Sequence, residues 1–379
     1  MNAEISKKRR ILFHINCLEH GGAERVVSNL ANKFAKEGYD VTVAVEWIGK
    51  NEYELDPRID HVMIGISDSE KSKGRISQYL LRIKHLKHCI KKAEPDIVIA
   101  FAHLAIYRAL MATIGTKVPV LISIRTNPIG HYDGRMDKLM IPILFPRAAG
   151  CVFQTTGQKD FFKPYLQDNS RIILNPLSEK YIGAEAPSVR RKCVVQSGRI
   201  VDFKYQPMLV DAFMDVHDKH PDWSLEIYGG DSGDGTWEIL EEKIQKYNAG
   251  DYIRLMGDSD SLERDLNDAG LYAFSSEWEG LPNALLEAMA LGLPVVSTDC
   301  PCGGPATLIT DEVNGLLVPV KDKDALAAGM LRLIEDGELA DKLGDNARKI
   351  VERAHPDVVY RQWAEYIEEI IGNHSSKTK

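Results

Sequence analysis

The chain has 379 residues, of which 44% are hydrophobic and 27% are charged. This length exceeds the core of one typical domain and predicts two domains. The formal net charge of −8 is opposite in sign to the basic balance of nucleic-acid-binding proteins, so no nucleic-acid partner is expected.

The N-terminal residues are predicted to form a strand rather than a signal peptide. Basic residues precede the apolar run, but His14 and Asn16 interrupt it and no small-residue cleavage site follows. No stretch approaches the roughly 20 apolar residues of a spanning helix, which places the chain in the cytoplasm. The six cysteines are scattered, and the lone CxC of Cys300 and Cys302 is interpreted as loop residues rather than as metal ligands.

The first half alternates apolar strands with helices. A helix is expected at 21–38, a longer one within 74–93 and another from about residue 104. Strands are expected at 11–18, 39–47, 96–101, 118–124, 150–155 and 171–174.

The second half continues this alternation after an aperiodic segment at 178–192. A helix is expected at 207–220 and another from near Pro282, with strands at 193–198, 224–230, 253–257, 271–276 and 294–299. Continuous apolar strands between helices predict an α/β protein of two doubly wound, Rossmann-like domains. The expected domains are 1–180, 190–355 and a C-terminal helix and polar tail, 356–379, which could pack back on the first domain.

Two glutamates eight residues apart lie at the start of the helix near Pro282. Glu279 precedes the helix and Glu287 lies about one turn inside it. Free backbone N–H groups at a helix start suit an anion such as phosphate, and two acceptor-only side chains suit a hydroxyl-rich ligand. The alternative is that Glu279 caps the helix and Glu287 is a solvated helix residue.

Two further loops could contact a ligand. Gly198 and Arg199 end a strand, and Lys204 follows five residues after Arg199. The planar guanidinium of Arg199 and the ammonium of Lys204 are both suited to bind a diphosphate. Gly21 and Gly22 separate the first strand from the first helix and let a ligand approach the backbone closely. The alternatives are a solvated basic loop and a plain tight turn.

Together these motifs resemble those of the retaining glycosyltransferases of family 4, which have the GT-B fold with two domains facing across a crevice. The resemblance covers nearly the whole chain. It is carried by EGLPNALLE (279–287), by Gly198-Arg199 with Lys204, and by GGAERVV (21–27), ILNPL (173–177) and NGLLVPVKD (314–322). With SIRTNP (123–128), the order of motifs is similar to members that extend bacterial glycans, including N-acetylgalactosaminyltransferases acting on lipid-linked oligosaccharides.

The resemblance implies a nucleotide-sugar donor in the C-terminal domain. Glu279 would contact the donor sugar and Glu287 the ribose, while Arg199 and Lys204 would hold the diphosphate and offset charge on the leaving group. The implied catalytic residues are Glu279, Arg199 and Lys204. The implied donor-binding set adds Gly198, Gly280, Leu281, Pro282, Asn283 and Glu287. No cofactor or metal is expected.

Four features need an interpretation of their own. Arg125 stands where many members carry a histidine that touches the donor sugar, and Thr307 stands where many carry glutamate. Asp258-Ser259-Asp260 forms a DxD, the metal motif of another glycosyltransferase fold, which we interpret as a coincidence here. His103 follows a strand, and a capping or packing role is favoured for it over a site in the crevice.

The basic helix within 74–93 is the expected acceptor or membrane-facing patch. Ile76, Leu80, Ile83, Leu86 and Ile90 follow helical spacing on one side, and Lys84, Lys87, His88 and Lys91 gather on another. An anionic membrane or the diphosphate of a lipid-linked acceptor would bind such a patch. The alternative is a solvated surface helix.

The resulting prediction is a retaining glycosyltransferase at the inner face of the cell membrane. It would move a hexose or N-acetylhexosamine from a nucleotide sugar, with UDP as the expected nucleotide, to a glycan acceptor on a polyprenyl diphosphate, in cell-surface polysaccharide or glycoconjugate biosynthesis. The expected acceptor-binding residues are Gly21, Gly22, Arg125, Lys84, Lys87 and Lys91. The alternatives are a non-catalytic scaffold subunit and a GT-B nucleotide-sugar epimerase.

Overall fold

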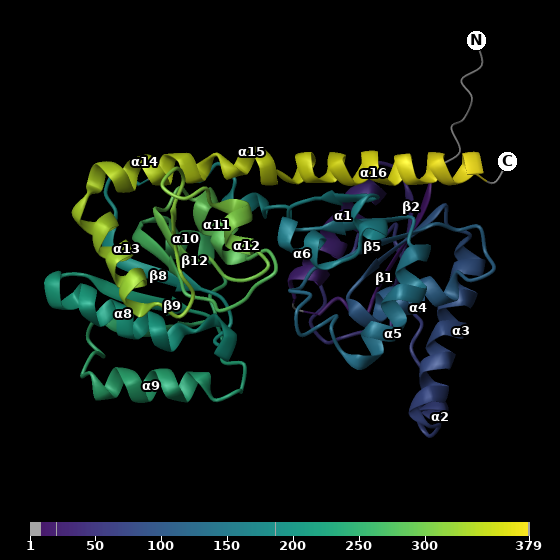
Figure 1. Cartoon of the computed structure of the whole chain (residues 1–379), viewed down its shortest axis with the longest axis horizontal. Helices are drawn as coiled ribbons and strands as arrows, with labels where there is room; N and C mark the ends of the chain where they lie inside the picture. The colour runs from purple at the N-terminus through teal and green to yellow at the C-terminus, as the bar shows by residue number, and fades with distance from the viewer. Residues whose placement is uncertain (1–8, 20, 186, 378–379) are drawn as a thin grey trace, which may run out of the picture. The chain divides into compact units, whose positions relative to one another are not determined.

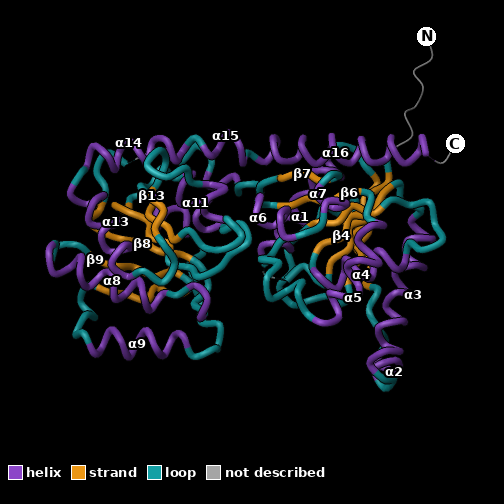
Figure 2. The backbone as a smooth tube through the Cα atoms, viewed as in Figure 1, coloured by secondary structure: helices purple, strands orange, loops and turns teal. Residues whose placement is uncertain are grey.

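The computed structural model describes residues 9–19, 21–185 and 187–377, which divide into two compact units (Figure 1). The first unit holds the described residues up to Gln154, together with Gln158–Ile173 and Val359 onward. The second unit holds Thr155–Gly157 and Leu174–Val358. Each unit is a sheet covered by helices (Figure 2).

The first unit is built on a seven-stranded parallel sheet of order β3-β2-β1-β4-β5-β6-β7. Its strands are β1 (Arg10–Ile15), β2 (Asp40–Val45), β3 (Asp60–Met63), β4 (Ile97–Phe101), β5 (Val120–Ser123), β6 (Gly150–Phe153) and β7 (Ser170–Ile172). Its helices are α1 (Gly22–Lys36), α2 (Asp68–Lys71), α3 (Arg75–Ala93), α4 (His103–Ala112), α5 (Arg135–Leu144), α6 (Thr156–Phe161) and α7 (Pro164–Gln167). The central strands are apolar throughout because helices cover both faces of the sheet.

The C-terminal helix α16 (Pro356–Lys377) contributes to the core of the first unit. Trp363 is fully buried and stacks on Phe101 at a ring separation of 5.7 Å. The hydroxyl of Tyr366 donates to the carbonyl of Asn169 and accepts from the N–H of Cys151. The last helix is therefore held in this unit by aromatic packing and by two hydrogen bonds of Tyr366.

The second unit is built on a six-stranded parallel sheet of order β10-β9-β8-β11-β12-β13. Its strands are β8 (Arg191–Ser197), β9 (Ser224–Tyr228), β10 (Ile253–Gly257), β11 (Ala269–Phe274), β12 (Val295–Thr298) and β13 (Leu316–Val318). Its helices are α8 (Gln206–Lys219), α9 (Thr236–Lys246), α10 (Leu262–Asn267), α11 (Asn283–Ala290), α12 (Gly304–Leu308), α13 (Lys323–Glu335), α14 (Gly337–Arg348) and α15 (Ile350–Ala354).

Each sheet reverses its strand order at one point, between β1 and β4 in the first unit and between β8 and β11 in the second. Doubly wound sheets bind ligands beyond the carboxyl ends of the strands at such a switch point. The loops after these four strands are therefore where a site is expected. They carry Gly21 and His103 in the first unit, and Arg199 and Glu279 in the second.

The predicted α/β alternation is confirmed, with three corrections. The strand expected at 171–174 lies at Ser170–Ile172. Ile76 and Leu80, expected on the apolar side of α3, are 79% and 59% exposed because the first turns of α3 extend past the sheet toward α2 (Figure 1). No range was predicted for strand β3 or for helices α2, α5, α6, α7, α9, α10, α12, α13, α14 and α15. Within the described ranges, no helix is both long and apolar enough to cross a membrane.

Candidate functional site

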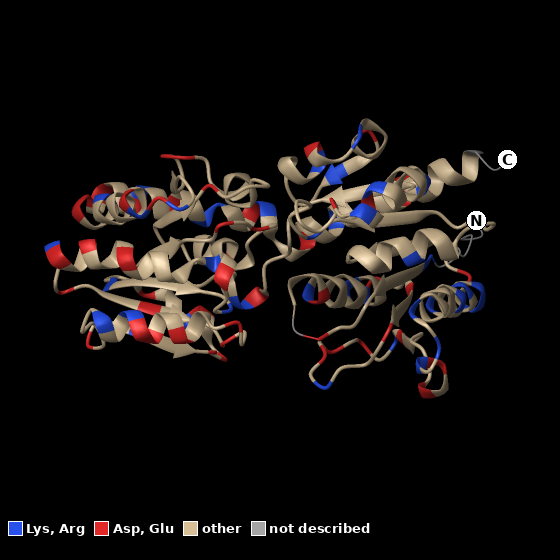
Figure 3. Ribbon diagram, turned by 60° about the horizontal axis from the view of Figure 1, so that its bottom comes forward, with Lys and Arg blue, Asp and Glu red and all other residues tan. Residues whose placement is uncertain are grey.

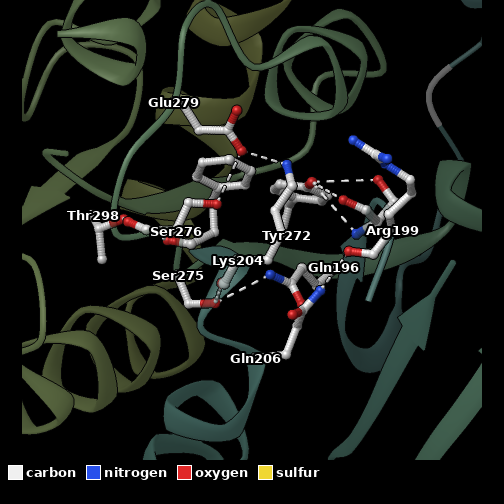
Figure 4. A network of polar contacts seen from close by, with 11 residues as sticks. Gln196, Arg199, Lys204, Gln206, Tyr272, Ser275, Ser276, Glu279 and Thr298 are labelled. Carbon is white, nitrogen blue, oxygen red and sulfur yellow. Dashed lines mark hydrogen bonds and ion pairs between the residues drawn. The ribbon is translucent and has the colours of Figure 1, made fainter. Parts of the chain in front are cut away.

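A buried ion pair lies at the switch point of the second unit (Figure 4). Lys204 ends a short 3-10 helix, Asp202–Lys204, after β8, and Glu279 lies in the loop after β11. The Lys204 Nζ lies 2.5 Å from Oε1 of Glu279, and the two side chains are only 13% and 14% exposed. Ser276 also donates its hydroxyl to this oxygen, at 3.2 Å. The fold thus brings together two residues that are 75 positions apart in the sequence.

A hydrogen-bonded network fixes the backbone around this pair. The Ser275 hydroxyl donates to the carbonyl of Lys204 at 2.8 Å, and Gln196 donates its amide to the Ser275 hydroxyl at 3.1 Å. Thr298 donates to the carbonyl of Ser276 at 2.7 Å. Sequence reasoning missed these supporting residues; their only signal was a polar residue at the end of an otherwise apolar strand.

Arg199 lies near the pair but does not take part in it. Its side chain stands apart from Lys204 and Glu279 (Figure 4), and its carbonyl accepts a hydrogen bond from Gln206. The residue is exposed, and no described residue pairs with its guanidinium. Arg199 therefore offers an uncommitted planar cation at the same strand end, suited to an anion.

Glycines bring the loop backbones of this site close together. Gly198 has φ +130°, in the region that favours glycine, and a Cβ at Gly229 would lie 2.1 Å from the carbonyl oxygen of Gly198. A Cβ at Gly304 would lie 1.9 Å from the carbonyl oxygen of Gly280. A side chain at Gly229 would therefore displace the loop of Gly198, and a side chain at Gly304 would displace the loop of Gly280.

Glu287 is not a solvated helix residue, since it is only 6% exposed. It lies in α11, which begins at Asn283, directly after Leu281 and Pro282. The pKa of Tyr272 is raised, mainly by burial and further by the charges of Glu287 and Glu279. Both carboxylates therefore act on one buried tyrosine, which places them in the same part of the unit. Asn283 accepts a hydrogen bond from Asn175.

The DxD residues form part of a local turn. The Ser259 hydroxyl donates to Asp265 and accepts from the N–H of Ser261. Asp258 lies against Gly230, where an added Cβ would lie 2.5 Å from Oδ2 of Asp258. Among the described residues, no group of three or more His, Cys, Asp or Glu side chains is arranged to hold a metal ion.

The expected acceptor residues lie in the first unit. Gly21 is the N-cap residue of α1 and Gly22 its first residue, and a Cβ at Gly21 would lie 2.0 Å from Oε2 of Glu24. The backbone at this helix start is therefore approached by a carboxylate of the chain itself. Arg125 follows β5, with its guanidinium 5.3 Å from the ring centre of Phe101 and 5.6 Å from that of Trp363. Burial lowers the pKa of Arg125 to about 9.

Lys and Arg residues recur along α3 (Figure 3). Lys84, Lys87 and Lys91 are exposed, but they do not share one environment. Lys84 and His88 line a groove between α3 and the edge strand β3, together with His85 and Lys92. Lys87 instead donates to the carbonyl of Ile114 at 3.0 Å. Lys91 lies on the exposed side of the last turn.

Two protein-family models match the chain, one over each half. The model described as "Glycosyltransferase Family 4" matches residues 20–177, and the model described as "Glycosyl transferases group 1" matches residues 178–350. The chain belongs to the family 4 glycosyltransferases. The second match begins in the segment that precedes β8 and includes the whole Lys204–Glu279 site.

Curated relatives of this glycosyltransferase match over nearly its full length. An uncharacterised glycosyltransferase of Haemophilus influenzae is 23% identical over 93% of this chain and 97% of its own. A Campylobacter jejuni N-acetylgalactosamine-N,N'-diacetylbacillosaminyl-diphospho-undecaprenol 4-α-N-acetylgalactosaminyltransferase is 26% identical over 90% of this chain and 94% of its own.

Solved structures show the same GT-B fold. A glycosyltransferase from Rickettsia africae has a TM-score of 0.82 at 20% identity, covering 97% of this chain and 100% of its own. Anabaena HepE, solved with UDP, has a TM-score of 0.80 at 17% identity, covering 95% of this chain and 100% of its own. The predicted fold and family are therefore confirmed.

Proposed function

We propose that this glycosyltransferase transfers a hexose or N-acetylhexosamine from a UDP-sugar to a lipid-linked glycan acceptor, with retention of anomeric configuration. The observation that carries the proposal is the buried Lys204–Glu279 pair at the switch point of the second sheet. With the uncommitted Arg199 beside it and the buried Glu287 in the following helix, this point combines two cations and two carboxylates.

Each of the four charged side chains has a proposed role in this transfer. Lys204 and Arg199 bind the diphosphate and offset the negative charge that develops on it as the bond to the sugar breaks. Glu279 accepts hydrogen bonds from sugar hydroxyls, and Glu287 accepts them from the ribose. When the donor binds, phosphate oxygens take over part of the contact that Lys204 makes with Glu279. Preorganised cations of this kind act most strongly where water is excluded.

The relatives suggest which substrates to test. The Campylobacter relative transfers N-acetylgalactosamine to an undecaprenyl-diphosphate-linked sugar, and HepE binds UDP. The test is a panel of UDP-, GDP- and ADP-sugars, with nucleotide release measured with and without an undecaprenyl-diphosphate-linked oligosaccharide. Release from one UDP-sugar that increases with the acceptor supports the proposal. Release from none of the donors, with acceptor present, contradicts it.

Catalysis is expected to continue without a divalent metal. Lys204 and Arg199 already supply two positive charges for the diphosphate, so EDTA should leave the rate of transfer unchanged. The measurement is the initial rate after chelation and gel filtration, with a mock-treated sample as the control. Loss of activity that manganese or magnesium restores would instead make Asp258 and Asp260 candidate ligands.

We also propose that α3 holds the enzyme at an anionic membrane. Its exposed stripe is apolar in the first half, at Ile76 and Leu80, and cationic in the second, at Lys84, Lys87 and Lys91. Cations near an anionic surface contribute about 1 kcal/mol each, and exposed apolar side chains add to the attachment. Changing the three lysines to glutamine should therefore weaken binding to anionic vesicles by about tenfold or more.

Vesicle flotation at low and high salt measures this effect, because salt screens exposed charges. Exchange of three exposed lysines on α8, α9 and α14 for glutamine, at Lys219, Lys246 and Lys342, is the matched control. Donor hydrolysis without acceptor should be unchanged in both variants. If the α3 variant floats with anionic vesicles as well as the wild type does, α3 is only a solvated face.

A further inference from the structure

A histidine–aspartate pair lies at the switch point of the first sheet. His103 is the first residue of α4 and follows β4, the strand that pairs with β1 where the order reverses. The corresponding position in the second unit carries the Lys204–Glu279 pair. The first unit therefore also has polar side chains at the place where doubly wound sheets bind their ligands.

The contacts of His103 fix the orientation of its imidazole. Its Nε2 lies 2.5 Å from Oδ1 of Asp137, and the Tyr107 hydroxyl donates to the same oxygen at 2.6 Å. The rings of Tyr107 and Tyr132 meet the imidazole edge-on, at centroid separations of 4.9 and 4.5 Å. The side chain of Asp137 is only 9% exposed, whereas that of His103 is 28% exposed. One end of the ring is thus anchored while the residue stays accessible to solvent.

Asp137 is held as a carboxylate. Burial raises its pKa, but hydrogen bonds from Tyr107, His103 and the backbone of Gly134 outweigh this effect, and the pKa is lowered overall. A carboxylate accepts hydrogen bonds only, so Nε2 of His103 carries the proton that it donates. In the neutral ring, Nδ1 is then an acceptor, and no described residue donates a hydrogen bond to it.

The backbone before His103 adopts an unusual conformation. Ala102 has φ +69° and ψ 146°, in a region that residues with a side chain rarely adopt. Such conformations persist where the surrounding structure imposes them, and they collect at ligand sites. At this position the conformation sets the direction in which the chain enters α4, and hence where His103 stands at the strand end.

We propose that His103 accepts a hydrogen bond from a hydroxyl group of the glycan acceptor, and that Asp137 positions the imidazole for this contact. The inference rests on the proposed function, because it takes the ligand of the first unit to be a glycan. A sugar hydroxyl is a suitable partner because it donates to a neutral ring nitrogen without any change of charge. Tyr132 and Tyr107 restrict rotation of the ring, so the contact selects one hydroxyl.

The test compares transfer and hydrolysis in position-103 variants, with UDP-GalNAc as donor and an undecaprenyl-diphosphate-linked oligosaccharide as acceptor. His103→Ala should lower kcat/KM for the acceptor by about tenfold or more, the loss expected for one substrate hydrogen bond. His103→Asn, whose side-chain oxygen can replace Nδ1, should recover part of the loss. Donor KM and donor hydrolysis without acceptor should remain at wild-type values.

The matched control is His217→Ala, in the second unit. His217 is also half-buried, stacks on Tyr252 and hydrogen-bonds to the carbonyl of Trp223, but it lies on α8 away from the strand ends. Its variant should lose stability without a selective loss of acceptor use.

If the wild type is active, either of two results would overturn this inference without affecting the proposed function. The first is acceptor kcat/KM unchanged in His103→Ala, and the second is an equal fall in transfer and donor hydrolysis with a lowered Tm, as a packing role predicts. A wild-type chain that transfers no sugar from any donor overturns the proposed function and this inference with it.

Discussion

Replacing Lys204 with alanine is expected to lower kcat/KM for the donor by about a hundredfold or more. The variant loses a charge-assisted contact to the diphosphate, worth about 1.5–3 kcal/mol. It also leaves Glu279 without its cationic partner at a position where the side chain is only 14% exposed, and an unpaired buried carboxylate both costs free energy and repels the diphosphate. Both effects act in the same direction.

The second effect can be separated with a double variant. In Lys204→Ala with Glu279→Gln the unpaired charge is gone, so the affinity for UDP should exceed that of Lys204→Ala alone. Titration calorimetry with UDP measures the difference. Lys243→Ala, which breaks an ion pair with Asp211 on the outer helices, is the control for loss of a lysine contact as such. Near wild-type kcat/KM in Lys204→Ala would refute the assignment of this residue, and the same result in Arg199→Ala would refute that of Arg199.

Substitution of the two glutamates should distinguish an effect on the chemical step from an effect on nucleotide binding. Glu279→Gln removes the charge that we propose to lie nearest the reacting sugar. It should lower kcat by about tenfold to a hundredfold, with a smaller effect on UDP affinity. Glu287→Gln removes the buried carboxylate that we propose as the acceptor for the ribose hydroxyls, and should weaken binding of UDP itself by about tenfold. Both substitutions keep the size of the side chain, so loss of packing contributes little.

Calorimetry with UDP and steady-state rates with the full donor distinguish the two roles. Glu241→Gln, on the exposed side of α9, is the control and should change neither quantity. If UDP affinity falls in Glu279→Gln and stays unchanged in Glu287→Gln, the two roles are assigned backwards.

The alternation of strands and helices was predictable because each buried strand is a continuous apolar run with turn residues around it. Strand β3 was missed for the opposite reason. It lies at the edge of the sheet, and Asp60–Met63 is a largely exposed strand with only two apolar residues. Ile76 and Leu80 were misplaced because helical periodicity identifies a face of α3 but does not show how far the sheet extends beneath it.

The candidate donor-binding residues could be named from motif and chain position, and their role stays a prediction. The residues that contact them could not be named in this way. The spacing of Glu279 and Glu287 is local and is visible in the sequence. The pairing of Lys204 with Glu279 depends on β8 and β11 being neighbours across the switch point, which no local pattern shows. The same limit explains Asp137, which lies 34 residues from His103 and has no motif of its own.

The most direct test of the central claim is transfer of a sugar by the purified chain from UDP-GalNAc to an undecaprenyl-diphosphate-linked oligosaccharide, followed by mass spectrometry and NMR of the product. The proposed function predicts an acceptor that is heavier by one N-acetylhexosamine, joined in the α-configuration of the donor, and predicts that Lys204→Ala forms little of it. A β-linked product would contradict retention. Absence of any product, with this donor and with the other nucleotide sugars, would contradict the assignment of the chain as an active transferase.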